Sequence, residues 1–353
     1  MSADVPRPVA CDDTSFDWLA AYLRLRHKQS SSRGARYLLY EADTSGFGDR
    51  VDGLLFALCL AALSERVLLS TDYWFAGYLR PKLPKIRFNA SIHPPLPTKA
   101  HMFFTTNGVL PAGISVDVAS PLIRVLANAG PHHAHTLENL TATRTPSGRR
   151  VAKLVGAYLT DRDRELHRLG SIHALELHMP SSCIFSSLLE MAPPLTDAIT
   201  AARQDMFGNA LQSYAAIHLR LGDTADGSSM EYRQCVHKTD ERISLPAALS
   251  HVQRALEATN GLPLYVATDN GLLKAQLRRK QGVHVHGCDD CATHIASNRF
   301  ARSAAPAKLM FEELGLLAAA SVLLCPPGNP SRFFRTAVYL RGAGCTLALR
   351  GGD

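Results

Sequence analysis

The feature that most constrains the fold is a strand, a glycine-containing loop, a helix and a second strand in direct succession. Short apolar runs bounded by turn residues are typical of buried strands. A strand–helix–strand unit joins two parallel strands, so this succession predicts a parallel sheet. The four elements are expected at Tyr37–Glu41, Thr44–Arg50, Val51–Leu63 and Arg66–Ser70.

A second series of alternating strands and helices begins at Ala215, which predicts a second parallel sheet. Its strands are expected at Ala215–Leu221, Leu264–Thr268, Val283–His286, Val322–Cys325 and Cys345–Leu349. Its helices are expected from Pro246, over Leu272–Lys280, over Lys308–Ala320 and from about Ser331.

The length of the chain fits two domains, because 353 residues exceed the usual size of one. We assign residues 1–200 to an N-terminal Rossmann-like domain and residues 201–353 to a C-terminal one. The linker is expected near Pro193–Gly208, and Pro81–Pro121 is expected to form long loops because it is rich in Pro, Asn and His. The predicted fold class is α/β.

Composition excludes several classes of protein. Hydrophobic residues make up 46% and charged residues 20%, which is ordinary globular usage. No stretch approaches the roughly 20 apolar residues of a membrane span, so none is expected in this chain. The net charge is +7, but the basic residues are dispersed and lack interleaved aromatic residues. We therefore expect no nucleic-acid partner, and a solvated basic surface is the favoured interpretation.

Cysteines and acidic pairs give no metal site. Cys288 and Cys291 form the only C-x-x-C among eight cysteines, and no second pair completes a zinc site. They are interpreted as a short loop disulfide or as two free thiols. Asp161 and Asp163 match a D-x-D metal motif, but they lie in a charged segment typical of a solvated helix face.

Ligands of doubly wound sheets bind at the carboxyl ends of the strands, where the strand order reverses. Four loops of this chain follow strands and carry polar or glycine residues, which makes them candidates for such a site. They are Gly46–Arg50, His218–Asp223, Ala267–Asn270 and Pro327–Phe333. Gly46 and Gly48 would let the backbone approach a ligand, but two glycines do not make the dinucleotide fingerprint.

The start of the last helix is a predicted anion site. Ser331 is a good N-cap, and the amides of Arg332, Phe333 and Phe334 would then be free at a helix N-terminus. The helix dipole contributes only about 0.3–1 kcal/mol, whereas a charged hydrogen bond contributes ~1.5–3 kcal/mol. A firm diphosphate site therefore needs an arginine, and Arg220 at a strand end is the candidate. The alternative is that Arg220 forms an ion pair with Asp223 or Asp269.

Four motifs of the chain, in the order in which they follow one another in the sequence, resemble motifs of the fucosyltransferase superfamily. That group includes plant cell-wall, bacterial chitooligosaccharide and protein O-fucosyltransferases. Cys183–Leu189, followed by Pro193 and Pro194, resembles the segment before the H-x-R motif of plant-type members. The four motifs are Gly46-Phe-Gly-Asp-Arg50, His218-x-Arg220-x-Gly222-Asp223, Val266-Ala-Thr-Asp269 and Ser331-x-Phe333.

The resemblance implies a GT-B arrangement, in which two Rossmann-like domains face a cleft. It also implies GDP-fucose as donor substrate, no metal and no cofactor. Arg220 would hold the β-phosphate, and His218 would shape the same pocket. Ser331 and the amide of Phe333 would bind the diphosphate. Asp269 would lie near the nucleotide. Gly46, Gly48, Asp49 and Arg50 would face the donor from the other domain.

Two residues depart from the family pattern. Asp49 stands where many members have Asn, and Phe334 stands where a second Ser is common. Both departures bear on activity more than on fold. A general base for the acceptor hydroxyl should be a carboxylate in the cleft, and Asp49 and Asp223 are the candidates.

The leading hypothesis is therefore an inverting, metal-independent fucosyltransferase acting on a glycan or glycoprotein acceptor. Two alternatives are a transferase of the same fold with another nucleotide sugar and a non-catalytic glycan- or nucleotide-binding relative. Eukaryotic members of the superfamily are usually Golgi-lumenal with an N-terminal anchor, which this chain does not show, and bacterial members are cytoplasmic. The Golgi lumen is the expected location and the cytoplasm the alternative.

Overall fold

The computed structural model describes most of the elements expected from the sequence. The described residues are 19, 22–24, 26–27, 34–41, 47–71, 77–82, 102–104, 122–127, 179–221, 244–287, 304–325, 331–342 and 347–348. Within them, every strand of the two larger sheets pairs in parallel with its neighbours. The expected α/β class is confirmed.

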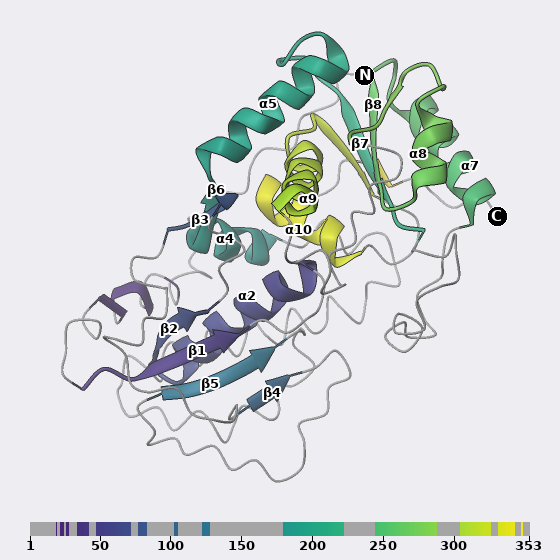
Figure 1. Cartoon of the computed structure of the whole chain (residues 1–353). Coiled ribbons are helices and arrows are strands. Elements are labelled where there is room, and N and C mark those ends of the chain that lie inside the picture. Colours follow the sequence, from purple (N-terminus) through teal and green to yellow (C-terminus); the bar gives the residue numbers. More distant parts are fainter. Residues whose placement is uncertain are drawn as a thin grey trace.

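The first sheet has the strand order β2-β1-β5-β4 (Figure 1). Helix α2 connects β1 to β2 and runs beside the sheet, so the first strand–helix–strand unit is present as expected. The bounds are β1 Tyr37–Glu41, α2 Phe47–Leu63, β2 Val67–Ser70, β4 Met102–Phe104 and β5 Leu122–Ala127.

The second sheet has the strand order β11-β10-β7-β8-β9. The chain proceeds from β7 outward to β9 and then returns to β10 on the other side of β7. This reversal of strand order places a topological switch point between β7 and β10. The strands are β7 Ala215–Leu219, β8 Leu264–Thr268, β9 Val283–His284, β10 Val322–Cys325 and β11 Leu347–Ala348. The helices are α7 Leu245–Ala258, α8 Gly271–Leu277, α9 Ala304–Ala318 and α10 Arg332–Arg341.

A layer of helices lies between the two sheets and joins them (Figure 1). Helix α10 packs against α2 and α4 (Met179–Leu188) as well as against α9, and α9 packs against α5 (Pro193–Phe207). One hydrophobic cluster runs through these helices from the first sheet to the second. Because this contact is apolar and continuous, the described parts of the two halves share one core.

Aromatic rings strengthen this shared core. The ring centroid of Phe311 in α9 lies 4.9 Å from that of Phe47 in α2 and 4.6 Å from that of Tyr78. Gly315 allows α9 to approach α5, because a Cβ there would lie 2.7 Å from Cγ1 of Ile199. The second half therefore binds the first through close helix packing.

A buried ion pair connects helix α8 to helix α9. Lys274 Nζ of α8 lies 2.7 Å from Glu313 Oε1 of α9, with side chains only 1% and 4% exposed. Burial raises the pKa of Glu313, while Lys274 acts in the opposite direction. Removing one partner of such a pair leaves an uncompensated buried charge, so the pair fixes α8 against α9.

The structure differs from the sequence-based expectation in several places. Helix α2 begins at Phe47, so residues 47–50 of the expected glycine loop form its first turn. The expected linker at Pro193–Gly208 is helix α5, which ends at Gly208 in the left-handed conformation that glycine accepts readily. Strand β4 lies within the expected Pro81–Pro121 loop segment. Helix α4, strand β5 and the small antiparallel sheet of β3 (Leu79–Pro81) and β6 (Leu189–Met191) were not predicted. The domain boundary at residue 200 stays a prediction.

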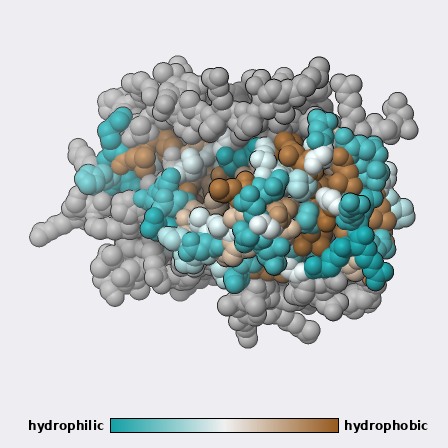
Figure 2. Space-filling model, turned by 90° about the horizontal axis from the view of Figure 1, so that it is seen from above, coloured by the Kyte–Doolittle hydropathy of each residue, from teal (hydrophilic) through white to brown (hydrophobic). Residues whose placement is uncertain are grey.

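The described surface is mixed in character. Seen from above, polar residues are distributed across the described face, with smaller apolar areas between them (Figure 2). The exposed large hydrophobic side chains of the described residues are Leu211 and Leu272. No helix among the described residues is both long and apolar enough to cross a membrane.

We expect Gly48→Ala to destabilise the protein. An added Cβ would lie 2.6 Å from the carbonyl oxygen and 2.7 Å from the Cβ of Arg332, so α2 and α10 would have to separate. Overpacking of this kind costs about 1–3 kcal/mol, which thermal or urea unfolding would measure. The matched control is Gly34→Ala, because a Cβ at Gly34 has no atom within 4 Å. Equal stability of the two variants would contradict the close helix contact.

Candidate active site

Five predicted site residues lie at the carboxyl ends of neighbouring strands. His218 is in β7, Arg220 follows it, and Asp269 follows the adjacent β8. Ser331 and Phe333 begin α10, the helix after β10, which pairs with β7 on its other side. The site therefore lies at the switch point between β7 and β10, where ligands of this topology bind.

Ser331 links the start of α10 to strand β7. Its Oγ accepts a hydrogen bond from the amide of Phe334 at 3.1 Å, which makes it the N-cap predicted from the sequence. The same Oγ lies 3.2 Å from Nδ1 of His218, and the ring centroid of Phe333 lies 5.3 Å from that of His218. The expectation of three free amides is corrected, because Ser331 already satisfies the amide of Phe334.

Burial keeps the imidazole of His218 neutral. The residue is 6% exposed, and desolvation lowers its pKa to about 4, with Asp269 opposing this effect and Arg220 adding to it. Because Ser331 Oγ accepts from the Phe334 amide, its own proton can go to Nδ1 when His218 carries hydrogen on Nε2. His218 thus acts here as a hydrogen-bonding support for the helix cap.

Arg220 and Asp269 lie within ion-pair distance. Nε of Arg220 is 3.9 Å from Oδ2 of Asp269, and the Arg220 side chain is 41% exposed. The other oxygen of Asp269 accepts a hydrogen bond from the amide of Leu221 at 2.9 Å. Asp269 therefore fixes the segment that carries Arg220, while much of the arginine side chain faces solvent. The ion pair considered from the sequence is present, and the exposed guanidinium is compatible with anion binding as well.

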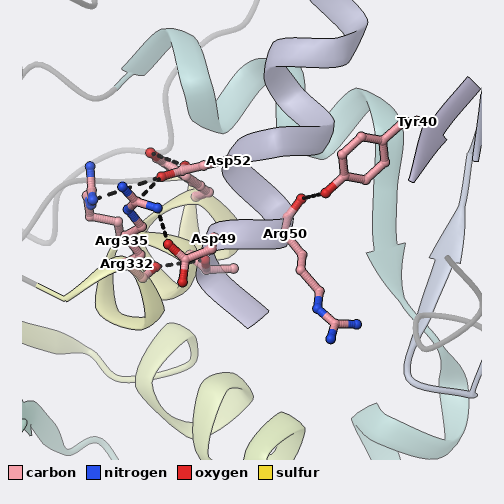
Figure 3. Close-up of polar contacts among 8 residues, drawn as sticks. Tyr40, Asp49, Arg50, Asp52, Arg332 and Arg335 are labelled. Atoms are coloured by element: carbon pink, nitrogen blue, oxygen red, sulfur yellow. Dashed lines mark hydrogen bonds and ion pairs between the residues drawn. The ribbon is translucent and has the colours of Figure 1, made fainter. Parts of the chain in front are cut away.

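The first turn of α2 lies against the first turn of α10 rather than standing apart as a loop. Gly48 contacts the backbone of Arg332, so its missing side chain serves a helix–helix approach. Asp49 forms an ion pair with Arg332. Arg50 is 8% exposed, its carbonyl accepts a hydrogen bond from Tyr40 at 2.7 Å, and its side chain points away from Asp49 (Figure 3).

Arg332, Arg335 and Asp52 were missed by sequence reasoning. Asp52 Oδ2 lies 3.8 Å from Arg332 Nε and 3.9 Å from Arg335 Nη2 (Figure 3). Oδ1 of Asp52 accepts a hydrogen bond from Tyr339 at 3.4 Å. The available signal was spacing: Asp49 and Asp52 are three residues apart, as are Arg332 and Arg335. Only the fold brings these two pairs together.

The two departures from the family pattern have structural explanations. Asp49 is paired with the cation of Arg332, which a neutral Asn would not match in charge. Phe334 is fully buried in the shared core, where a serine hydroxyl would need a partner. Both residues therefore serve the contact between α10 and its neighbours.

Some predicted residues are not placed. Gly46, Asp223, the Asp161–Asp163 motif and the Cys288–Cys291 pair lie outside the described residues. Among the residues that are described, no group of three or more His, Cys, Asp or Glu side chains could hold a metal ion.

Solved structures with the same architecture are fucosyltransferases. A mutant of Arabidopsis thaliana FUT1 in complex with GDP matches 95% of this chain and 78% of its own, with 12% identity and a TM-score of 0.50. The chain therefore has the fold of this solved structure. The expected GT-B arrangement of two parallel-sheet units is thereby confirmed.

Further similarities are more distant. NodZ from Bradyrhizobium matches 86% of this chain and 92% of its own at 14% identity and a TM-score of 0.45. NodZ soaked with GDP-fucose matches at 13% identity and the same TM-score. No protein-family model matches the chain, and no curated protein sequence matches it.

The burial of His218 predicts its titration. Its pKa is lower in the folded state than the ordinary value near 6.5, so the neutral form stabilises the fold fully above that value. This contribution should be lost as the pH falls from about 6.5 to about 4, because the unfolded chain binds the proton first. Histidine NMR should show the His218 ring signals unchanged down to pH 5. A midpoint near 6.5 would contradict the buried neutral ring.

Proposed function

We propose that the protein is an inverting glycosyltransferase that moves fucose from GDP-fucose to a hydroxyl of a glycan or glycoprotein, without a metal. The fold supports this proposal, and the related FUT1 structure is a complex with GDP. GDP-fucose as the donor follows from the resemblance of the four motifs.

A single observation carries the proposal: Arg220, two residues after His218, and the Ser331-capped end of α10, which contacts His218, come together at the strand-order switch. A guanidinium and a helix N-terminus both favour anions. Their convergence at the carboxyl edge of a parallel sheet suits a nucleoside diphosphate, whose two phosphates need donors from more than one element.

The chemistry follows from the leaving group. The acceptor oxygen forms a bond to the anomeric carbon while the bond from that carbon to the β-phosphate oxygen breaks. The electron pair leaves with GDP, and the acceptor proton passes to a base. Arg220 and the amide of Phe333 would stabilise the charge that develops on the β-phosphate, a role in which fixed donors are usually the largest catalytic term.

The base is a second part of the proposal. Asp49 and Asp223 are the candidates, and Asp49 would have to leave its ion pair with Arg332 to accept a proton. This observation favours Asp223 for the role. It also supports the alternative of a non-catalytic relative that binds the nucleotide without transferring a sugar. Another nucleotide sugar stays possible in this proposal, because an anion site does not select the sugar or the base.

A lumenal location fits the cysteines. Cys183 and Cys325 are both disulfide-bonded and buried. Disulfides persist in oxidising compartments and are rare in the cytosol, so the Golgi lumen is the location we propose.

We expect GDP to stabilise the wild-type protein against heat, with or without EDTA, more than UDP or ADP does. At about a hundredfold excess over its dissociation constant, a ligand adds roughly 2.7 kcal/mol. Arg220→Ala should then lower turnover of GDP-fucose by about a hundredfold or more, because it removes a donor to the leaving group. Calorimetry, thermal shift and a coupled GDP-release assay measure these effects.

The matched control is Arg80→Ala, which removes an exposed arginine paired with Glu190 on the small antiparallel sheet. Its turnover should equal that of wild type. GDP binding without any transfer to a panel of glycans would support the non-catalytic alternative. A large drop in the melting temperature of Arg220→Ala, with unchanged turnover, would make Arg220 a structural partner of Asp269.

The cysteines give a separate test of location. Mass spectrometry of an unreduced digest should find Cys183 and Cys325 in cross-linked peptides. Reduction should lower the free energy of unfolding, since loss of a native disulfide typically costs about 2–5 kcal/mol. Free thiols at both positions in protein purified from its native compartment would contradict a lumenal location.

A further inference from the structure

Helices α2 and α10 are joined by a polar cluster that we call the α2–α10 clasp. It consists of Asp49 and Asp52 of α2 with Arg332 and Arg335 of α10 (Figure 3). Tyr339 of α10 also belongs to it, because its hydroxyl donates a hydrogen bond to Asp52. Residues three and four apart lie on one face of a helix, so each helix contributes one continuous stripe. The Asp49–Arg332 pair joins residues 283 positions apart in the sequence.

The charges of the clasp balance, and its inner part is buried. Two carboxylates face two guanidiniums. The Asp52 side chain is 3% exposed and that of Arg335 10%, whereas Asp49 and Arg332 at the outer edge are 28% and 25% exposed. Pairs that are partly shielded from water hold their geometry better than fully exposed pairs.

The clasp lies directly beside the predicted diphosphate site. Arg332 is the first residue of α10 and follows Ser331, the cap whose Oγ lies 3.2 Å from His218. A cation in the first turn of a helix is opposed by the helix dipole, whereas carboxylates are favoured near such a turn. The carboxylates of α2 therefore give the Arg332 guanidinium a partner in the other half of the molecule.

We propose that Asp49 is a positioning residue for the donor site, acting through Arg332 to hold the first turn of α10 in register with His218 and Arg220. The inference rests on the proposed function and deepens it. Asp49 would then serve the reaction from α2 without touching the donor, in place of the role as a base considered from the sequence.

Because the helices pack closely at Gly48, the clasp is sensitive to small movements of α10 relative to α2. The backbones of α2 and α10 meet there without an intervening side chain, so the ion pair sets how α10 lies on α2. The amide of Phe333 and the hydroxyl of Ser331 move together with that turn. Since small misplacements of binding groups can cost large factors in binding and rate, a loosened clasp should weaken the diphosphate site.

The sign of the effect distinguishes positioning from simple electrostatics. Asp49→Asn removes a negative charge near an anion site, so a purely electrostatic role predicts tighter GDP binding. A positioning role predicts that Asp49→Asn binds GDP about tenfold more weakly, because a loss of this size is typical of the coupling between residues in contact. Isothermal titration with GDP and thermal unfolding should be measured for wild type, Asp49→Asn, Arg332→Ala, their combination and Arg332→Lys.

We expect both single variants to weaken GDP binding and the combination to be no weaker than Arg332→Ala alone. Arg332→Lys, which keeps the cation, should recover part of the affinity. Hydrogen exchange at the amides of Phe333 and Phe334 should be faster in Asp49→Asn, whereas the control Asp205→Asn, on the exposed face of α5, should match wild type.

Unchanged or tighter GDP binding by Asp49→Asn would overturn the positioning role. A lowered melting temperature with wild-type affinity would do the same, since it would make the clasp a purely structural contact. If wild type binds no nucleotide, the proposed function fails and this inference fails with it. If wild type binds GDP and the variants bind it equally well, only this inference fails.

Discussion

The close approach of Gly48 to the backbone of Arg332 is the contact on which the rest of the structure depends. It brings the first turns of α2 and α10 together, and each of these turns begins at the carboxyl edge of a different sheet. Because α10 also packs on α4 and α9, the two halves are joined by a continuous apolar core instead of meeting only at a polar surface. Such an apolar interface restricts relative movement of the halves, so the predicted anion site at the start of α10 and the facing helix α2 are held in one arrangement.

Much of the site could be predicted because parallel-sheet topology converts sequence order into spatial position. His218 lies near the carboxyl end of β7, Asp269 directly follows β8 and Ser331 follows β10, and the carboxyl ends of these strands lie along one edge of the sheet. The strands themselves could be recognised locally, since β7, β8 and β10 are short, mostly apolar runs of the kind that sheets covered on both faces require. The cap at Ser331 is also a local property, because it depends on a hydroxyl three residues before an amide.

What the sequence could not provide is the pairing of elements that are distant along the chain. Asp49 was expected to face the donor because its motif resembles that of the fucosyltransferases, yet its partner is an arginine 283 residues away. Helix α2 was expected to begin at Val51, after a glycine-containing loop. In the structure it begins at Phe47, and packing of this turn against α10 outweighs the low helix propensity of Gly48. The linker between the halves was expected near Pro193–Gly208, but this segment forms helix α5, whose first turn accommodates the prolines.

The charges around the anion site are arranged before any ligand arrives. Two cations of this region, Arg220 and Arg332, lie within ion-pair distance of Asp269 and Asp49, and burial keeps the neighbouring His218 neutral. Carboxylates beside an anion site would be unfavourable if their only effect were on the local potential. Their effect here is geometric, because Asp269 also binds the amide of Leu221 and Asp49 ties α10 to α2. Electrostatic catalysis depends on hydrogen-bond donors that need no reorganisation when charge develops. The two carboxylates lower the net positive potential at the predicted anion site, but they also fix the donors there. Fixed donors can stabilise a developing negative charge strongly even where the net potential is lower.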